Sequence, residues 1–165
     1  MERIKVSNNF YLDEFIDPHT YINDLHHGLN LLDFRLIQIA QKVREFCGKP
    51  LFINTWWDFQ DKSISEIEND TSIRKWSGLR TSRCNIGAKN SAHKLGKAID
   101  LKGNQKELFG LVKENAKEFH AIGVRRLEDP NITIGWLHVD TLERNTKPNS
   151  IRVVDLTKCT QTIYF

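Results

Sequence analysis

Apolar positions in the first third of the chain recur at the spacing of a helix. Between residues 29 and 47 they follow steps of three and four, which places them on one face of a predicted helix that Gly48 ends. A short amphipathic turn is predicted over residues 9–18, and a second long helix over residues 105–120. The side chains that face inward in the first helix are Leu32, Leu36, Ile39, Val43 and Phe46.

Shorter apolar stretches indicate strands. They cover residues 51–55, 124–127, 136–141, 151–154 and 162–165. Residues 58–74 are mostly polar and predict an exposed, partly helical insertion. Because helices and strands do not alternate regularly, the pattern predicts an α+β fold in which an antiparallel sheet is backed by helices.

Length and composition are those of one globular domain that spans residues 1–165. With 39% hydrophobic and 27% charged residues, the chain can bury a core without covalent staples. No run approaches the ~18 apolar residues of a membrane span. The first residues also lack the apolar segment of a secretory signal, so we expect a protein that is cytoplasmic as synthesised and has no membrane contact. The net charge of +3 is dispersed, and we expect a monomer without a nucleic-acid partner.

The cysteines also indicate a protein of a reducing compartment. Cys47, Cys84 and Cys159 are odd in number and widely spaced. This pattern argues against a disulfide framework and against a cysteine-type zinc site, so free thiols are expected.

Residues 91–100, which read S-A-H-K-L-G-K-A-I-D, hold the first candidate chemistry. Gly96 allows the chain to bend back, so that His93 and Asp100 can converge on one point. Imidazole nitrogen and carboxylate oxygen both suit Zn²⁺. Small Ala98 shares a strand face with Asp100 and leaves room beside a metal. From the residues alone, a polar surface turn is the alternative.

Residues 135–140, which read G-W-L-H-V-D, offer a third ligand. In a strand, Trp136, His138 and Asp140 point to one side. His138 then completes a set of two histidines and one carboxylate, which leaves a fourth tetrahedral position for water. Asp140 is placed to hold the ring of His138 or a neighbouring group. A histidine packed within a strand is the alternative.

These stretches resemble a known family. Residues 91–100 match the S-x-H-x-x-G-x-A-x-D signature of the zinc D-Ala-D-Ala carboxypeptidases and their relatives, which include L-alanyl-D-glutamate endopeptidases of phage lysis and murein endopeptidases with the hedgehog-type fold. Residues 136–140 resemble the family's second ligand block, and residues 77–80 (S-G-L-R) its G-x-R segment. Residues 10–15 (F-Y-L-D-E-F) are similar to the start of short phage- and prophage-type members.

The resemblance implies roles for single residues. His93, Asp100 and His138 would bind Zn²⁺, and Arg80 would stabilise the oxyanion or bind a substrate carboxylate. Ser91 would bind the amino end of the substrate, with the capping of a turn as its alternative. Trp136 is expected in the substrate cleft, or otherwise in the core.

The sequence departs from the family at one position. The best-known members carry a catalytic Glu or Asp three residues before the last histidine, where this chain has Gly135. Glu128, at the end of a predicted strand, is the first candidate for the missing general base, and a solvated strand end is the alternative.

The resemblance implies a zinc-dependent carboxypeptidase or endopeptidase that hydrolyses peptidoglycan stem peptides, delivered to the cell wall by phage-type release. Because of Gly135, a non-catalytic cell-wall-binding or phage structural module with the same fold is the competing hypothesis. A zinc hydrolase with another amide substrate is the third.

Overall fold

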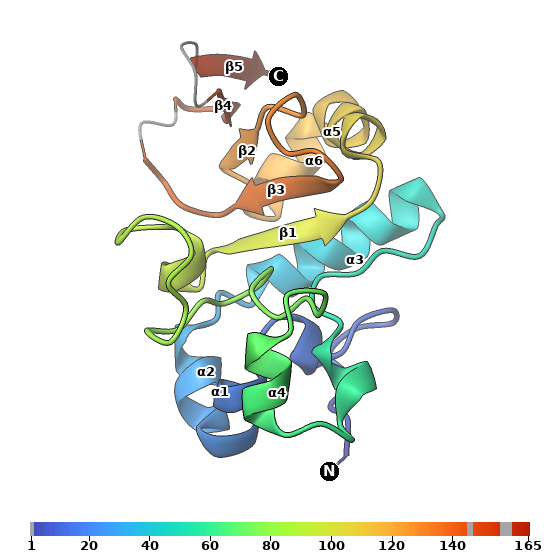
Figure 1. Cartoon of the computed structure of the whole chain (residues 1–165). Coiled ribbons are helices and arrows are strands. Elements are labelled where there is room, and N and C mark those ends of the chain that lie inside the picture. Colours follow the sequence, from blue (N-terminus) through green and yellow to red (C-terminus); the bar gives the residue numbers. More distant parts are fainter. Residues whose placement is uncertain (1, 145–146, 156–159) are drawn as a thin grey trace.

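A mixed β-sheet forms the upper half of the molecule in Figure 1. The computed structural model describes residues 2–144, 147–155 and 160–165, and five strands of these residues pair in the order β1-β3-β2-β4-β5. They are β1 (Ala98–Lys102), β2 (Arg126–Glu128), β3 (Trp136–Asp140), β4 (Ser150–Val154) and β5 (Thr160–Tyr164).

The α+β class is confirmed, but the prediction of an antiparallel sheet is wrong at one pair. Strands β2 and β4 run parallel, whereas the other neighbouring strands are antiparallel. The chain leaves β3 and crosses to the far side of β2, so β4 enters the sheet in the direction of β2. Strand periodicity carries no information about such a crossover, because it fixes the faces of a strand and not its neighbours.

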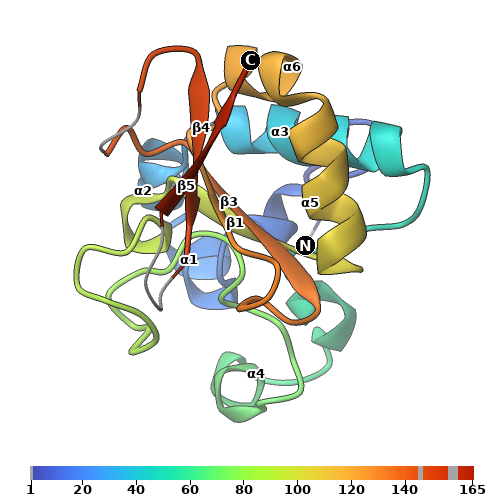
Figure 2. The same ribbon diagram turned by 90° about the horizontal axis from the view of Figure 1, so that it is seen from above.

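The two faces of the sheet differ in chemistry because side chains alternate along each strand. One face is apolar and packs against α3 (Arg35–Cys47), α5 (Gln105–Glu114) and α6 (Ala116–Ala121), which lie together on one side of the strands in Figure 2. The opposite face carries the polar residues of β1, β2 and β3. The buried apolar residues of the strands are Ile99, Leu101, Leu127, Leu137, Val139, Ile151 and Val153.

Both predicted long helices are divided in two. The first is split into α2 (Leu25–Leu31) and α3, because Asp33 is bound by distant groups: its amide donates to the Gly96 carbonyl (2.8 Å) and its carboxylate accepts from the Thr141 hydroxyl (2.6 Å). The second is interrupted at Asn115, whose φ of −111° and ψ of 30° are not helical, and continues as α6.

Residues 51–55 do not form the predicted strand. In this stretch Phe52 makes an isolated bridge with Lys102, while the amides of Asn54 and Thr55 donate to the carbonyls of Glu14 and Arg74. The backbone is therefore satisfied by separate loops, and Leu51 and Ile53 are buried without a continuous ladder, whereas Phe52 is exposed.

Short helices build the lower half of Figure 1 around the aromatic core residue Trp56. Its indole Nε1 donates to the carbonyls of Asp13 (2.8 Å) and Ile16 (2.9 Å). The predicted insertion is partly helical, as expected, although Ile67 and Ile73 within it are buried. The elements are η1 (Leu12–Glu14), α1 (Pro18–Asn23), α2, η2 (Trp56–Phe59) and α4 (Ile64–Asn69).

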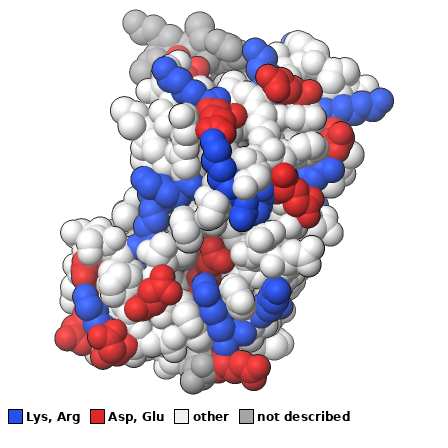
Figure 3. All heavy atoms as spheres, turned by 90° about the vertical axis from the view of Figure 1, so that its right-hand side faces the viewer, with Lys and Arg blue, Asp and Glu red and all other residues white. Residues whose placement is uncertain are grey.

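Other features of the described residues bear on the sequence-based expectations. No helix among them is long and apolar enough to cross a membrane. Cys47 and Cys84 are free, and Cys159 lies outside the described residues. On the face drawn in Figure 3, basic and acidic side chains are interspersed.

Candidate metal centre

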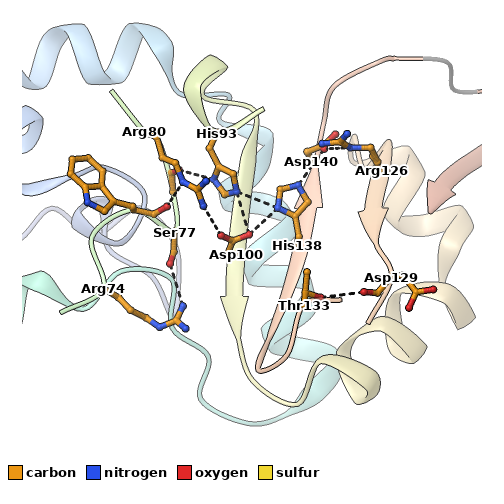
Figure 4. A network of polar contacts seen from close by, with 12 residues as sticks. Arg74, Ser77, Arg80, His93, Asp100, Arg126, Asp129, Thr133, His138 and Asp140 are labelled. Atoms are coloured by element: carbon orange, nitrogen blue, oxygen red, sulfur yellow. Dashed lines mark hydrogen bonds and ion pairs between the residues drawn. The ribbon is translucent and has the colours of Figure 1, made fainter. Parts of the chain in front are cut away.

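The side chains of His93, Asp100 and His138 converge above the polar face of the sheet (Figure 4). Asp100 Oδ1 lies 2.8 Å from His138 Nδ1 and 3.2 Å from His93 Nε2, and the two ring nitrogens are 3.2 Å apart. The three residues are 3%, 8% and 4% exposed in chain order, so bulk water is largely excluded from this cluster.

Strand register and one tight turn bring the cluster together. Asp100 of β1 stands directly opposite His138 of β3, and paired residues in a sheet project from the same face. His93 belongs to η3 (His93–Leu95), which ends at Gly96 with a φ of 66°. This left-handed residue turns the chain into β1 and holds His93 above Asp100.

Each histidine has one nitrogen fixed by a group outside the cluster. His93 Nδ1 lies 2.9 Å from the Gly78 carbonyl, so it carries the proton and leaves Nε2 free as a ligand. His138 presents Nδ1 to the cluster, and its Nε2 lies 3.4 Å from Asp140 Oδ2. Asp140 is fully buried and accepts a hydrogen bond from Arg126 Nε. Supporting contacts of this kind orient metal-binding histidines.

The donor set fits a zinc ion. Two imidazole nitrogens and one carboxylate oxygen are common ligands of catalytic zinc, and bonds of about 2.0 Å in a tetrahedron imply donor separations of about 3.3 Å. The separations of 2.8 to 3.2 Å observed here are close to that value. The residues could therefore hold a metal ion with little movement.

Two of the three groups are held in the form that binds a metal ion, and the third is protonated. Burial raises the pKa of Asp100, but the charges of His93 and His138 and their hydrogen bonds outweigh it and hold the pKa below its usual range. Burial lowers the pKa of His93, and the opposing effect of Asp100 is smaller. The pKa of His93 therefore stays below its usual value. For His138, hydrogen bonds to Asp100 and Asp140 overcome burial and raise the pKa. A cation bound here would therefore displace a proton from His138.

Arg80 and Trp136 border a cavity of about 390 Å³ that reaches Asp100. Arg80 Nη2 donates to Asp100 Oδ2 (3.0 Å), and its Nε donates to the Trp76 carbonyl (2.6 Å). The predicted arginine is thus held against the His93–Asp100–His138 cluster. Trp136 is partly exposed on the cavity wall and does not belong to the buried core.

Ser91 does not line this cavity. Its carbonyl accepts from the amides of Lys94 and Leu95, so it begins the turn that delivers His93.

Glu128 lies on the face of the sheet above which the candidate ligands converge. Leu127 pairs with Val139, and because side chains alternate along a strand, the next residue of β2, Glu128, shares the polar face with His138, although it does not line the cavity. Its negative charge contributes to the raised pKa of His138. Gly135 has a φ of 89°, at which any L side chain is strained.

Sequence reasoning missed three residues of this region. Arg126 is the ion-pair partner of Asp140; the alternation along β2 could have indicated that it shares a face with Glu128. Arg74 and Ser77 line the cavity but belong to the irregular stretch before β1, where no periodicity indicates which way a side chain points.

Comparison with known proteins adds no further information, because no family model, no curated protein and no solved structure matches the chain. The site is thus defined by its own geometry: a buried His–Asp–His cluster that could hold a metal ion, at the end of an open cavity.

Proposed function

We propose that this protein is a zinc-dependent peptidase that hydrolyses the stem peptides of peptidoglycan. The observation that carries the proposal is the convergence of His93 Nε2, Asp100 Oδ1 and His138 Nδ1 beside a cavity of about 390 Å³. The substrate class is supported by the similarity of residues 91–100 and 136–140 to the ligand blocks of cell-wall peptidases.

A zinc ion held by His93, Asp100 and His138 would supply a water molecule of lowered pKa and a Lewis acid for the scissile carbonyl. Arg80 is anchored by Asp100 and by the Trp76 carbonyl, and it donates its remaining N–H groups to the oxygen that becomes negative in the transition state. Trp136 forms an apolar wall for the substrate.

Glu128 is the proposed general base. Its place in β2 brings a carboxylate to the polar face, which it shares with His138, from this strand and not from position 135. In this role it accepts the proton of the attacking water and returns it to the leaving amine. Ser91 does not line the cavity, and its contact with the amino end of the substrate stays a prediction.

The second candidate function is a non-catalytic module that binds cell-wall peptides through the same cavity. The absence of a carboxylate at Gly135 favours it. It differs from the first in a measurable way, because such a module binds zinc and peptide but releases no product.

The test combines elemental analysis with digestion of purified muropeptides. Wild type is expected to hold about one zinc per chain, and His93→Ala to hold none and to be inactive. Glu128→Gln is expected to keep zinc and lose turnover. His26→Ala, which changes an exposed histidine of α2, is the matched control and keeps both properties.

Three results separate the alternatives. A wild-type chain that takes up no zinc refutes the peptidase proposal. Zinc and muropeptide binding without cleavage favour the binding module. Unchanged turnover in Glu128→Gln removes that residue from the mechanism and leaves the metal site in place.

A further inference from the structure

The cavity beside the metal centre contains more positive than negative charge. Its walls combine the aromatic residues Trp76 and Trp136 with the polar residues Arg74, Ser77, Arg80 and Asp100. Apolar walls strengthen any charge interaction within the cavity, because they exclude water and lower the local dielectric constant.

The charged groups around this cavity, with one exception, have an ion pair or several hydrogen-bond acceptors. Asp100 is bound by Arg80 and the two histidines. Glu68 accepts two hydrogen bonds from Arg83, at 3.0 and 2.8 Å. Lys75 takes part in no ion pair among the described residues, but its ammonium donates to two backbone carbonyls within residues 70–73.

Arg74 is the exception. None of the ion pairs among the described residues includes its guanidinium, which donates one hydrogen bond to Ser77 Oγ (3.2 Å). It is half-buried, and burial lowers its pKa, with Asp100 as the acidic group that acts against this shift. A half-buried guanidinium without a counter-ion is costly unless a ligand supplies one.

Ser77 fixes the position of this guanidinium relative to the His93–Asp100–His138 cluster. The Ser77 carbonyl accepts from the Asp100 amide (2.7 Å), while the Ser77 hydroxyl accepts from Arg74. Asn54, which is 2% exposed, holds the Ser77 amide through its Oδ1 (2.9 Å). The guanidinium is thus tied through Ser77 to β1, the strand that carries Asp100, and Figure 4 shows the hydrogen bond between Arg74 and Ser77.

We propose that Arg74 binds a free carboxylate on the residue that leaves after cleavage. This inference rests on the proposed peptidase function and narrows its substrate class to peptides whose leaving residue has a free carboxylate on the carbon next to the scissile nitrogen. Two bonds of peptidoglycan share this chemistry: one before a C-terminal D-alanine, and one before a D-glutamate that continues through its side chain. The planar guanidinium is suited to such a group, because it can donate two parallel hydrogen bonds to a carboxylate.

The experiment compares substrates that differ in this carboxylate alone. The zinc-loaded full chain is given an N-acylated peptide ending in D-Ala-D-Ala and its C-terminal amide, and then an L-Ala-γ-D-Glu peptide with a free or amidated α-carboxylate. For each pair, kcat/KM for the acid is divided by kcat/KM for the amide. The pair with the larger ratio identifies the bond that the protein cleaves. In wild type, kcat/KM is expected to be at least about tenfold higher for the acid.

The variants isolate the contribution of Arg74. In Arg74→Gln, kcat/KM for the acid is expected to fall by about tenfold or more and to approach that of the amide, whose own rate changes little. Arg74→Lys keeps the positive charge but not the planar guanidinium. Its kcat/KM for the acid is expected to lie between the values of wild type and Arg74→Gln. Arg44→Gln removes the same charge from α3, outside this cavity, and is the matched control. Zinc content shows that each variant is folded at the site.

The outcomes distinguish this inference from the proposed function. If the acid preference persists in Arg74→Gln, or if wild type shows none, the assignment of Arg74 is overturned while the peptidase stands. If no peptide is cleaved, the peptidase proposal fails, and calorimetric titration of the same peptides into the same zinc-loaded samples decides about Arg74. Tighter binding of the acid that is lost in Arg74→Gln supports the inference, and equal affinities overturn it.

Discussion

Gly96 and Gly48 form a natural pair for testing how the metal centre is built. Both end a helical turn in the left-handed region, with φ values of 66° and 65°. They differ in their surroundings. A Cβ at Gly96 would lie 2.0 Å from the Leu31 carbonyl oxygen, whereas a Cβ at Gly48 would meet nothing within 4 Å.

The structure gives different magnitudes for the two alanine substitutions. Alanine in the left-handed region costs about 1 kcal/mol relative to glycine, and Gly48→Ala is expected to lose that amount of unfolding free energy. Gly96→Ala carries the same strain and must also displace the backbone of Leu31 or of η3. Overpacking of this kind adds about 1–3 kcal/mol, so a total loss of about 2–4 kcal/mol is expected.

Urea unfolding in the presence of a chelator measures both losses without a contribution from metal. Zinc affinity is then measured on the same samples. It is expected to fall in Gly96→Ala, because a shift of the turn moves His93 away from Asp100, and to be unchanged in Gly48→Ala. Equal losses of stability in the two variants, or full zinc affinity in Gly96→Ala, would refute the reasoning.

Two further predictions concern buried charges. Burial, assisted by Asp13, raises the pKa of Glu14 from 4.5 to about 7, so the folded protein holds this proton more tightly than the unfolded chain and stability falls as the pH rises through this window. Glu14→Gln is expected to flatten that fall and to raise the unfolding free energy at pH 8 by about 1–3 kcal/mol; an unchanged slope in urea unfolding between pH 5 and 8 would contradict this. Arg126→Gln removes one of two cationic partners of the fully buried Asp140 carboxylate, the other being His138 Nε2 at 3.4 Å, and is expected to destabilise the metal-free protein by about 1–3 kcal/mol. Adding Asp140→Asn should restore part of the loss, and a loss below about 1 kcal/mol in Arg126→Gln would show that this ion pair contributes little to stability.

The parts of the fold that depend on local periodicity could be predicted from the sequence. The alternation in residues 136–140 indicated that His138 points away from the apolar core, and Ala98 and Asp100 were expected on one face of a strand; both strands form. The glycine between His93 and Asp100 indicated the bend, which the left-handed Gly96 makes.

The parts that depend on distant contacts could not be predicted. The helix break at residues 32–34 requires Gly96 and Thr141, which bind Asp33 from more than sixty positions away in the chain. The pairing of β2 with β4 depends on a crossover, and the pairing of Asp140 with Arg126 depends on register. None of these leaves a repeating pattern in the sequence.

The outer edge of β1 has a consequence for how any extended peptide approaches the molecule. The amides of Asp100 and Lys102 on this edge already donate to the carbonyls of Ser77 and Phe52, each at 2.7 Å. A peptide therefore cannot extend the sheet there by β-augmentation, the recognition mode that needs free edge amides. It must instead lie across the polar face and be recognised by side chains. The same two hydrogen bonds protect this edge against pairing with a second copy of the chain, which is a common route to aggregation.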